Sequence, residues 1–151
     1  MAKEENNDLV ISSPAFENDG DIPSKYTCDG EEINPPLKIA NIPGEAKTLA
    51  LIVEDPDASK GVFDHWLVWN IEPTGNIAED SVPGTVGVNS FGNTGYGGPC
   101  PPSGSHRYYF RLFALDSNLN LNAGADRRAL EQTMHPHIIA KGVLMGRYKK
   151  R

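Results

Sequence analysis

The sequence predicts a mainly β fold built from antiparallel strands, with one or two short helices. Three observations support this prediction. Most apolar residues fall in short runs that are rich in β-branched and aromatic side chains. Fifteen glycines and twelve prolines divide these runs at short intervals. Only one segment has the pattern of a helix. Short strands with frequent turns are typical of a sandwich or a barrel and disfavour a doubly wound parallel sheet.

Six runs are expected to form strands. Residues 48–55 are the strongest candidate, because an apolar and β-branched run ends there at Pro56. Residues 65–71 form a second apolar run, which ends before Pro73. The expected strands, in chain order, are residues 9–12, 37–40, 48–55, 65–71, 106–115 and 143–148.

The expected helix covers residues 127–134. Asp126 is a good N-cap residue, because its carboxylate can accept a hydrogen bond from the first turn. Leu130 and Met134 are four residues apart and therefore lie on one face. Pro136 ends the segment.

Residues 83–104 form a long segment with little apolar material. Seven glycines and four prolines fill half of it. Long loops in small domains are usually functional or disordered. Disorder normally goes with high charge and few aromatic residues, whereas this segment has almost no charge and contains Phe91 and Tyr96. We therefore expect an ordered, functional loop.

Length and charge bound the class of protein. The 151 residues fit one domain spanning 1–151. The net charge of −6 disfavours a nucleic-acid binder, which needs cationic surface to displace counterions. No apolar run approaches the roughly 18 residues of a membrane span, and the amino terminus has no apolar signal-peptide core. We expect a cytoplasmic protein with no membrane span and no nucleic-acid partner.

The chain has two cysteines, Cys28 and Cys100. In a cytoplasmic protein both are expected to be reduced, partly buried thiols. The alternative is a disulfide that ties the glycine-rich segment to the N-terminal part of the chain.

Polar side chains that could do chemistry lie at the ends of three expected strands. Because strand residues alternate between two faces, Asp55 continues the apolar face of Leu51 and Val53. His106 and Tyr108 open the apolar face of another strand in the same way. Each of these strands thus places polar groups at the mouth of a buried stripe.

His65 opens the third strand. Alternation aligns His65 with Leu67, Trp69 and Ile71. If the three strand ends meet, one acid, two imidazoles and one phenol frame a small cavity. Imidazoles donate hydrogen bonds and become cationic when protonated, and glycine-rich backbone can bring N–H groups close to a ligand. Phosphate or carboxylate is therefore the expected ligand.

Three longer motifs contain these residues. They are Asp-Pro-Asp-Ala at 55–58, Phe-Asp-His-Trp at 63–66 and Gly-Pro-Cys-Pro-Pro-Ser-Gly-Ser-His-Arg-Tyr at 98–108. Their order and spacing resemble the phosphatidylethanolamine-binding protein family, which includes the Raf kinase inhibitor proteins, and most of all its compact prokaryotic branch. Further matches at 26–30, 34–37 and 146–149 extend the resemblance over nearly the whole chain.

The resemblance implies a sandwich of two packed antiparallel sheets with one or two short flanking helices. It also implies a pocket for phosphate-type anions, including the phosphoryl headgroup of phosphatidylethanolamine. The ligand-binding residues carried over to this chain are Asp55, His65, Gly98, Pro99, His106 and Tyr108. The supporting residues carried over are Asp57, Trp66, Pro101 and Arg107, and Arg107 is expected to pair with a carboxylate such as Asp57.

Two features depart from the family pattern. Ser59 stands where a proline usually completes the Asp-Pro-Asp-Ala motif, so a less rigid loop is expected there. The long C-terminal helix that eukaryotic members hold over the pocket has no clear counterpart after Tyr148.

These features predict a small anion-binding protein that is not an enzyme and needs no cofactor. The alternative is a kinase or protease inhibitor that acts by protein contact, a role the family also contains. A weak hydrolase is least favoured, because Ser103 and Ser105 flank His106 without a nucleophile elbow. No metal is expected, although Asp55, His65 and His106 would make a two-His-one-carboxylate set. A homodimer is left open.

Overall fold

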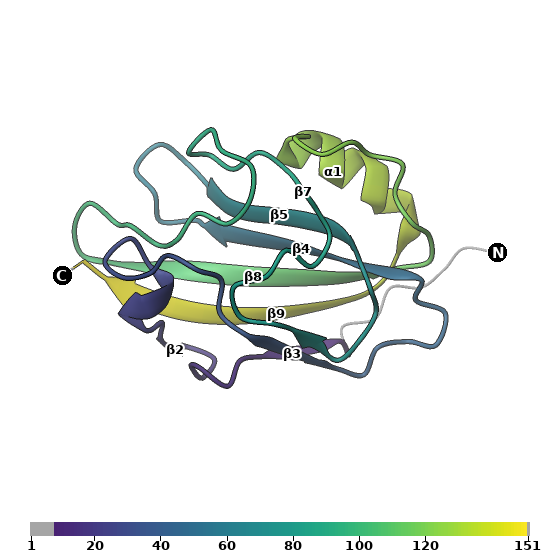
Figure 1. The fold of residues 1–151 in the computed structure, drawn as a ribbon, viewed down its shortest axis with the longest axis horizontal. Helices are drawn as coiled ribbons and strands as arrows, with labels where there is room; N and C mark the ends of the chain where they lie inside the picture. The colour runs from purple at the N-terminus through teal and green to yellow at the C-terminus, as the bar shows by residue number, and fades with distance from the viewer. Residues whose placement is uncertain (1–7, 151) are drawn as a thin grey trace.

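A computed structural model describes residues 8–150 as two facing β-sheets and one α-helix (Figure 1). The larger sheet contains β2 (Gly20–Asp21), β4 (Thr48–Asp55), β5 (Phe63–Ile71), β7 (Thr85–Val86), β8 (Ser105–Leu115) and β9 (Ile138–Lys149). The smaller sheet contains β1 (Val10–Ser12), β3 (Leu37–Ala40) and β6 (Asn76–Ile77). The predicted mainly β sandwich is confirmed.

Strand order is β2-β9-β8-β4-β5-β7 in the larger sheet and β1-β3-β6 in the smaller. Neighbouring strands pair antiparallel, except for the short β2, which pairs in parallel with β9. The long strands β4 and β8 are therefore flanked on both sides and form the middle of the larger sheet. Loops from the ends of β4, β7 and the start of β8 gather at the left of Figure 1, the end of the sheet where the candidate site lies.

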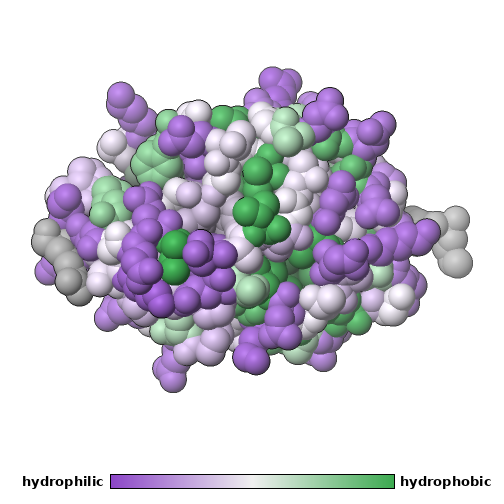
Figure 2. Space-filling view, in the orientation of Figure 1, coloured by the Kyte–Doolittle hydropathy of each residue, from purple (hydrophilic) through white to green (hydrophobic). Residues whose placement is uncertain are grey.

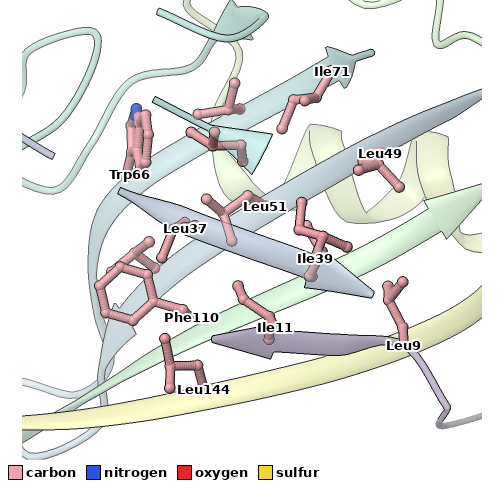
Figure 3. Close-up of a cluster of buried hydrophobic side chains, with 14 of the residues drawn as sticks. Leu9, Ile11, Leu37, Ile39, Leu49, Leu51, Trp66, Ile71, Phe110 and Leu144 are labelled. Atoms are coloured by element: carbon pink, nitrogen blue, oxygen red, sulfur yellow. The ribbon is translucent and has the colours of Figure 1, made fainter. Parts of the chain in front are cut away.

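The main core fills the space between the two sheets (Figure 3). Ile11 of β1 and Ile39 of β3 lie over the larger sheet, because every second residue of these strands points inward. The labelled side chains of this cluster are Leu9, Ile11, Leu37, Ile39, Leu49, Leu51, Trp66, Ile71, Phe110 and Leu144. The face seen in Figure 2 is mostly hydrophilic, with hydrophobic residues in a band near its middle and in smaller groups elsewhere.

Helix α1 (Arg127–Met134) covers the other face of the larger sheet. Asp126 caps it as predicted, accepting a hydrogen bond from the Ala129 amide at 2.9 Å. Leu130 and Met134 pack into a second apolar cluster, with residues from β4 and β5. Two short 3₁₀ turns, η1 (Ser24–Tyr26) and η2 (His135–His137), complete the described elements.

A β-bulge interrupts β5 at His65. Val53 of β4 pairs with Trp66, but the next residue, Glu54, pairs with Asp64, so His65 has no partner of its own in this ladder. A bulge re-aims side chains locally and is often found beside a functional site. The bulge separates His65 from Leu67, which faces α1.

The predicted face of His65 was therefore wrong. Trp66 belongs to the main core, whereas Leu67 and Trp69 belong to the cluster under α1. Without the bulge, His65 would share the face of Leu67. The extra residue instead turns His65 toward Tyr108, with 5.3 Å between the ring centroids.

The predicted elements correspond to structural elements, with differences at their ends. β5 begins two residues earlier than expected and β9 begins at Ile138 rather than residue 143. Three pairs of strand residues were missed, in β2, β6 and β7. Strands of two residues are too short for a hydrophobic period to be visible in the sequence.

The expectation of two reduced thiols was wrong. Cys28 and Cys100 form a disulfide with a Cα–Cα distance of 5.4 Å. Residues 26–30 and the glycine-rich segment lie side by side, and the amide of Cys28 donates to the carbonyl of Pro99 at 3.1 Å. The expected cytoplasmic location therefore did not predict the state of these cysteines. Their pairing depends on the fold, which brings the two residues within bonding distance.

Candidate functional site

A pocket of about 430 Å³ opens at the end of the larger sheet where β4 ends and β5 and β8 begin. β4 and β8 are antiparallel neighbours, as are β4 and β5. The last residues of β4 and the first residues of β5 and β8 therefore meet at one end of the sheet. The lining residues are Asp55, Ala58, Ser59, Lys60, Gly61, Val62, Phe63, His65, Ser90, Phe91, Cys100, Pro101, Pro102, His106 and Tyr108.

Asp55 and His106 form a buried pair in the pocket. Nδ1 of His106 lies 2.6 Å from Oδ2 of Asp55, and the His106 side chain is only 12% exposed. The other carboxylate oxygen accepts a hydrogen bond from the Asp57 amide at 2.8 Å. With Asp55 ionised, Nδ1 carries the proton and Nε2 is the ring nitrogen left for a ligand.

His65 is held by the glycine-rich segment. Its Nδ1 lies 2.8 Å from the Gly97 carbonyl, and the Gly97 amide donates to the His65 carbonyl at 2.8 Å. Since a carbonyl only accepts, Nδ1 donates this bond. Burial lowers the pKa of His65 below its usual value of 6.5, although the Gly97 carbonyl acts in the opposite direction. At neutral pH, His65 is therefore neutral and Nε2 carries a lone pair.

Tyr108 supplies a phenol to the floor of the pocket. Its side chain is fully buried, and no described residue gives its hydroxyl a hydrogen-bond partner. Burial raises the pKa of Tyr108 far above its ordinary value, and the nearby charge of Asp55 adds to this shift. The hydroxyl is therefore a permanent donor that lacks an acceptor within the described chain, which is unusual for a buried polar group.

The lining residues form an aromatic rim around this polar floor. Phe63 and Phe91 meet edge to face with 4.7 Å between centroids, and both rings also contact His65. Phe91 is 46% exposed and Val62 is 54% exposed, although both are large apolar residues. Lys60 is the only lysine or arginine among the described lining residues.

Arg107 points away from the pocket and braces the loop after β4. Its guanidinium donates to both carboxylate oxygens of Asp57 at 2.7 and 2.9 Å, and its amide donates to the same side chain. The pairing expected from the sequence is therefore present. Hydrogen bonding to Arg107 lowers the pKa of Asp57 to about 2, against a smaller opposing effect of burial.

The backbone of residues 96–99 is fixed against residues 26–32. The Tyr96 hydroxyl donates to the Tyr26 carbonyl at 2.7 Å, and the Gly98 amide donates to a Glu32 carboxylate oxygen at 3.2 Å. A Cβ on Gly98 would lie 2.7 Å from the Tyr26 carbonyl oxygen. Gly98 thus permits close packing of two backbone segments.

The structure brings together five of the ten residues carried over from the family motifs. Asp55, His65, His106, Tyr108 and Pro101 line the pocket, the last having been expected only as support. Gly98 and Pro99 were expected in the pocket but do not line it; both are buried behind it, facing residues 26–32. Their predicted role as direct ligands stays a prediction; in the structure they fix the loop against residues 26–32.

The supporting residues Asp57, Arg107 and Trp66 also lie outside the lining. Trp66 is 1% exposed and packs edge to face on Tyr96, with 5.4 Å between centroids. Sequence reasoning missed the apolar rim at 58–63 and 90–91. The exposed apolar residues there gave no periodic signal, because loop residues have no fixed alternation.

Two other chemistries find less support in the geometry. Ser103 and Ser105 are exposed and do not line the pocket, whereas Ser90 does and accepts a hydrogen bond from the Asp64 amide. Within residues 8–150, no group of three or more His, Cys, Asp or Glu side chains is placed to hold a metal ion.

Comparison with known proteins finds relatives in both sequence and fold. The family model described as phosphatidylethanolamine-binding protein matches residues 12–149. A UPF0098 protein of Methanothermobacter thermautotrophicus is 47% identical over 150 residues, which cover 94% of this chain and 99% of that one. A UPF0098 protein of Archaeoglobus fulgidus is 48% identical over 157 residues, which cover 98% of this chain but 53% of that one. The crystal structure of a phosphatidylethanolamine-binding protein homologue from Chlamydia trachomatis has a TM-score of 0.92 at 42% identity, covering 97% of this chain and 100% of that one.

Proposed function

The chain belongs to the phosphatidylethanolamine-binding protein family, and from that premise we propose that its pocket binds a small anion, phosphate or a phosphorylated headgroup, without catalysing a reaction. The Tyr108 hydroxyl is proposed to donate to an anion oxygen. Nε2 of His65 and Nε2 of His106 are the other proposed contacts, and while Nδ1 holds the ring proton each accepts a hydrogen bond from a P–OH group of the ligand. Asp55 acts on the anion through His106, because it accepts a hydrogen bond from Nδ1–H and so orients the ring.

The observation that carries this proposal is the unpartnered hydroxyl of Tyr108. A buried donor without an acceptor lowers the stability of the fold by about 1–3 kcal/mol. An anion oxygen in the pocket would supply the missing acceptor. The family name supports the same class of ligand, because phosphatidylethanolamine carries a phosphodiester.

Charge balance favours binding together with a proton. Asp55 carries a negative charge and His65 is neutral at neutral pH, so the pocket repels a dianion unless an imidazole is protonated. A protonated phosphate carries less negative charge than the dianion and offers a P–OH donor to the Nε2 lone pairs, so it fits this pocket better. Affinity for phosphate should therefore fall as the pH rises from 5 to 8.

Calorimetric titration with inorganic phosphate tests the proposal. Tyr108→Phe keeps the ring and removes only the donor, so affinity should fall roughly tenfold or more, the effect of one hydrogen bond to a charged group. His106→Ala should abolish binding. His135→Ala is the matched control, because His135 is exposed in η2 and does not line the pocket. Unchanged affinity in both pocket variants, or no phosphate binding by the wild type, would reject the proposal.

A kinase or protease inhibitor is the second candidate, and the exposed Phe91 and Val62 favour it. Large apolar side chains on a pocket rim are typical of surfaces that contact a partner protein. Phe91→Ser should then weaken inhibition of a test kinase or protease, while Tyr108→Phe should leave inhibition unchanged. The reverse order of effects would assign the activity to the anion pocket.

The cytoplasmic location remains part of the proposal. Over residues 8–150 no helix has the length and apolar character needed to cross a membrane. The Cys28–Cys100 bond bears on the location, because disulfides persist mainly in oxidising compartments. Alkylation of free thiols in cells quenched with acid, followed by mass spectrometry, would show how much of the pair is reduced where the protein works.

A further inference from the structure

The disulfide lies at the wall of the pocket. Cys100 is exposed and lines the pocket next to Pro101 and Pro102, whereas Cys28 is half-buried in the segment after η1. The bond joins positions 72 residues apart in the sequence. It thus joins a solvent-exposed residue to a half-buried one, beside the place where a ligand would sit.

Hydrogen bonds hold the chain on either side of Cys100 but not at Cys100 itself. Upstream, Tyr96, Gly98 and Pro99 are each bonded to the 26–32 segment. Downstream, the Gly104 carbonyl accepts from the Lys150 amide, and β8 begins at Ser105. Between these anchors, residues 100–103 make no hydrogen bond to any other residue of the described chain.

The disulfide is therefore the one cross-link that fixes the 100–103 wall within the described structure. Pro101 is buried and Pro102 is exposed, and both face the pocket. Loss of the bond would leave four residues free to rearrange between two fixed points. A ligand would then have to order this wall on binding, which weakens its affinity.

We propose that the Cys28–Cys100 pair is a redox-modification site for a dithiol reductant, and that its reduction lowers the affinity of the adjacent pocket for an anion. This inference rests on the proposed function, since it concerns the same pocket. Reduction of the disulfide is the controlling step, and the pocket wall at residues 100–103 is the part that becomes free to rearrange.

Thiol–disulfide exchange accounts for the reaction in full. A thiolate of the reductant attacks Sγ of Cys100, the more exposed residue of the pair, and forms a mixed disulfide while the Cys28 thiolate leaves and takes a proton. The second thiolate of the reductant then attacks the reductant sulfur that is bonded to Cys100. The Cys100 thiolate leaves and also takes a proton. The protein gains two electrons and two protons, and the dithiol becomes a disulfide.

The coupling is reciprocal. If the oxidised protein binds the anion more tightly by some factor, then the bound anion disfavours reduction by the same factor. The coupling factor between oxidation and anion binding can therefore be measured in two independent ways, which should give the same value.

The first measurement is calorimetric titration of the full chain with inorganic phosphate, before and after reduction by dithiothreitol. The dissociation constant should increase by about tenfold on reduction, a coupling of about 1.4 kcal/mol. A variant carrying Cys28→Ser and Cys100→Ser should bind like the reduced protein and should not respond to dithiothreitol. The second measurement is the ratio of dithiothreitol to its oxidised form at half-reduction, which should rise about tenfold in saturating phosphate.

Each outcome decides between the claims. Equal affinity of the oxidised and reduced proteins, or a half-reduction ratio that phosphate does not move, overturns this inference and leaves the proposed function standing. Absence of phosphate binding by the oxidised protein overturns both. If reduction unfolds the whole chain, as shown by loss of near-ultraviolet circular dichroism, the local mechanism at residues 100–103 is overturned even if affinity is lost.

Discussion

His65 and His106 line the same pocket, but their Nδ1 atoms face different partners. Nδ1 of His106 donates to a carboxylate, and Nδ1 of His65 donates to a backbone carbonyl. A carboxylate compensates the charge of an imidazolium, whereas a carbonyl supplies only a dipole. His65, buried beside a carbonyl, is therefore the ring suited to stay neutral.

Acid should destabilise the protein through His65. Burial lowers the pKa of His65 below its unfolded value of 6.5. Below pH 6.5 the unfolded chain binds a proton at this imidazole more readily than the folded chain does. The contribution of neutral His65 to stability is therefore complete above pH 6.5 and decreases as the pH falls below it. The melting temperature of the wild type should decrease more steeply between pH 7 and pH 5 than that of His65→Asn in scanning calorimetry. Parallel curves for the two proteins would contradict the assignment.

Residue types and order predicted much of the pocket, but not its geometry. Asp55, His106 and Tyr108 were placed correctly at strand ends because an unbroken alternation runs through β4 and β8. His65 was placed on the wrong face, since a bulge adds one residue without leaving a mark in the apolar pattern. The partner of each Nδ1 atom depends on loop backbone and was not visible in the sequence.

The glycine-rich segment acts as an element in its own right, although it has little regular structure. Gly97 pairs with His65 and Gly98 packs on the Tyr26 backbone, so the segment connects the pocket to the 26–32 region. Its low charge and aromatic residues predicted order but not its position. Gly98 and Pro99 face the neighbouring backbone of residues 26–32, a position that the sequence did not indicate.

Gly98→Ala tests this role of the segment. The new Cβ would lie 2.7 Å from a backbone oxygen that has little freedom to move, so stability should fall by about 1–3 kcal/mol, as in other overpacked sites. Phosphate affinity should fall with it, because the segment positions His65. Gly44→Ala is the matched control, since a Cβ at Gly44 meets no atom within 4 Å. Chemical denaturation measures the stability of the two variants. Equal losses of stability would show that Gly98 is not closely packed.

At the scale of the whole molecule, the larger sheet carries an apolar cluster on each face and the site at one end. The main core packs under the small sheet, and the second cluster packs under α1. The family resemblance and the short strands predicted this sandwich well, since a fold class follows from many weak local signals. Pairing between distant cysteines depends on tertiary approach, and composition did not predict it.

The disulfide should stabilise the molecule as a whole. It closes a loop of about 70 residues, which on the chain-entropy model stabilises the fold by roughly 4 kcal/mol. Urea denaturation of the oxidised protein and of the variant carrying Cys28→Ser and Cys100→Ser should differ by about this amount. A domain of this size has a typical stability of about 5–15 kcal/mol, which exceeds the expected loss, so the variant should remain folded. A difference below about 1 kcal/mol would show that the cross-link constrains only the pocket wall.

The most direct test of the central claim is nuclear magnetic resonance of the imidazole rings during titration with inorganic phosphate. The ring signals of His65 and His106 should move with one shared dissociation constant, while those of His135 and His137 in η2, outside the pocket lining, stay in place. Signals of all four rings that stay still, or that drift together with ionic strength, would contradict an anion-binding pocket at this end of the sheet.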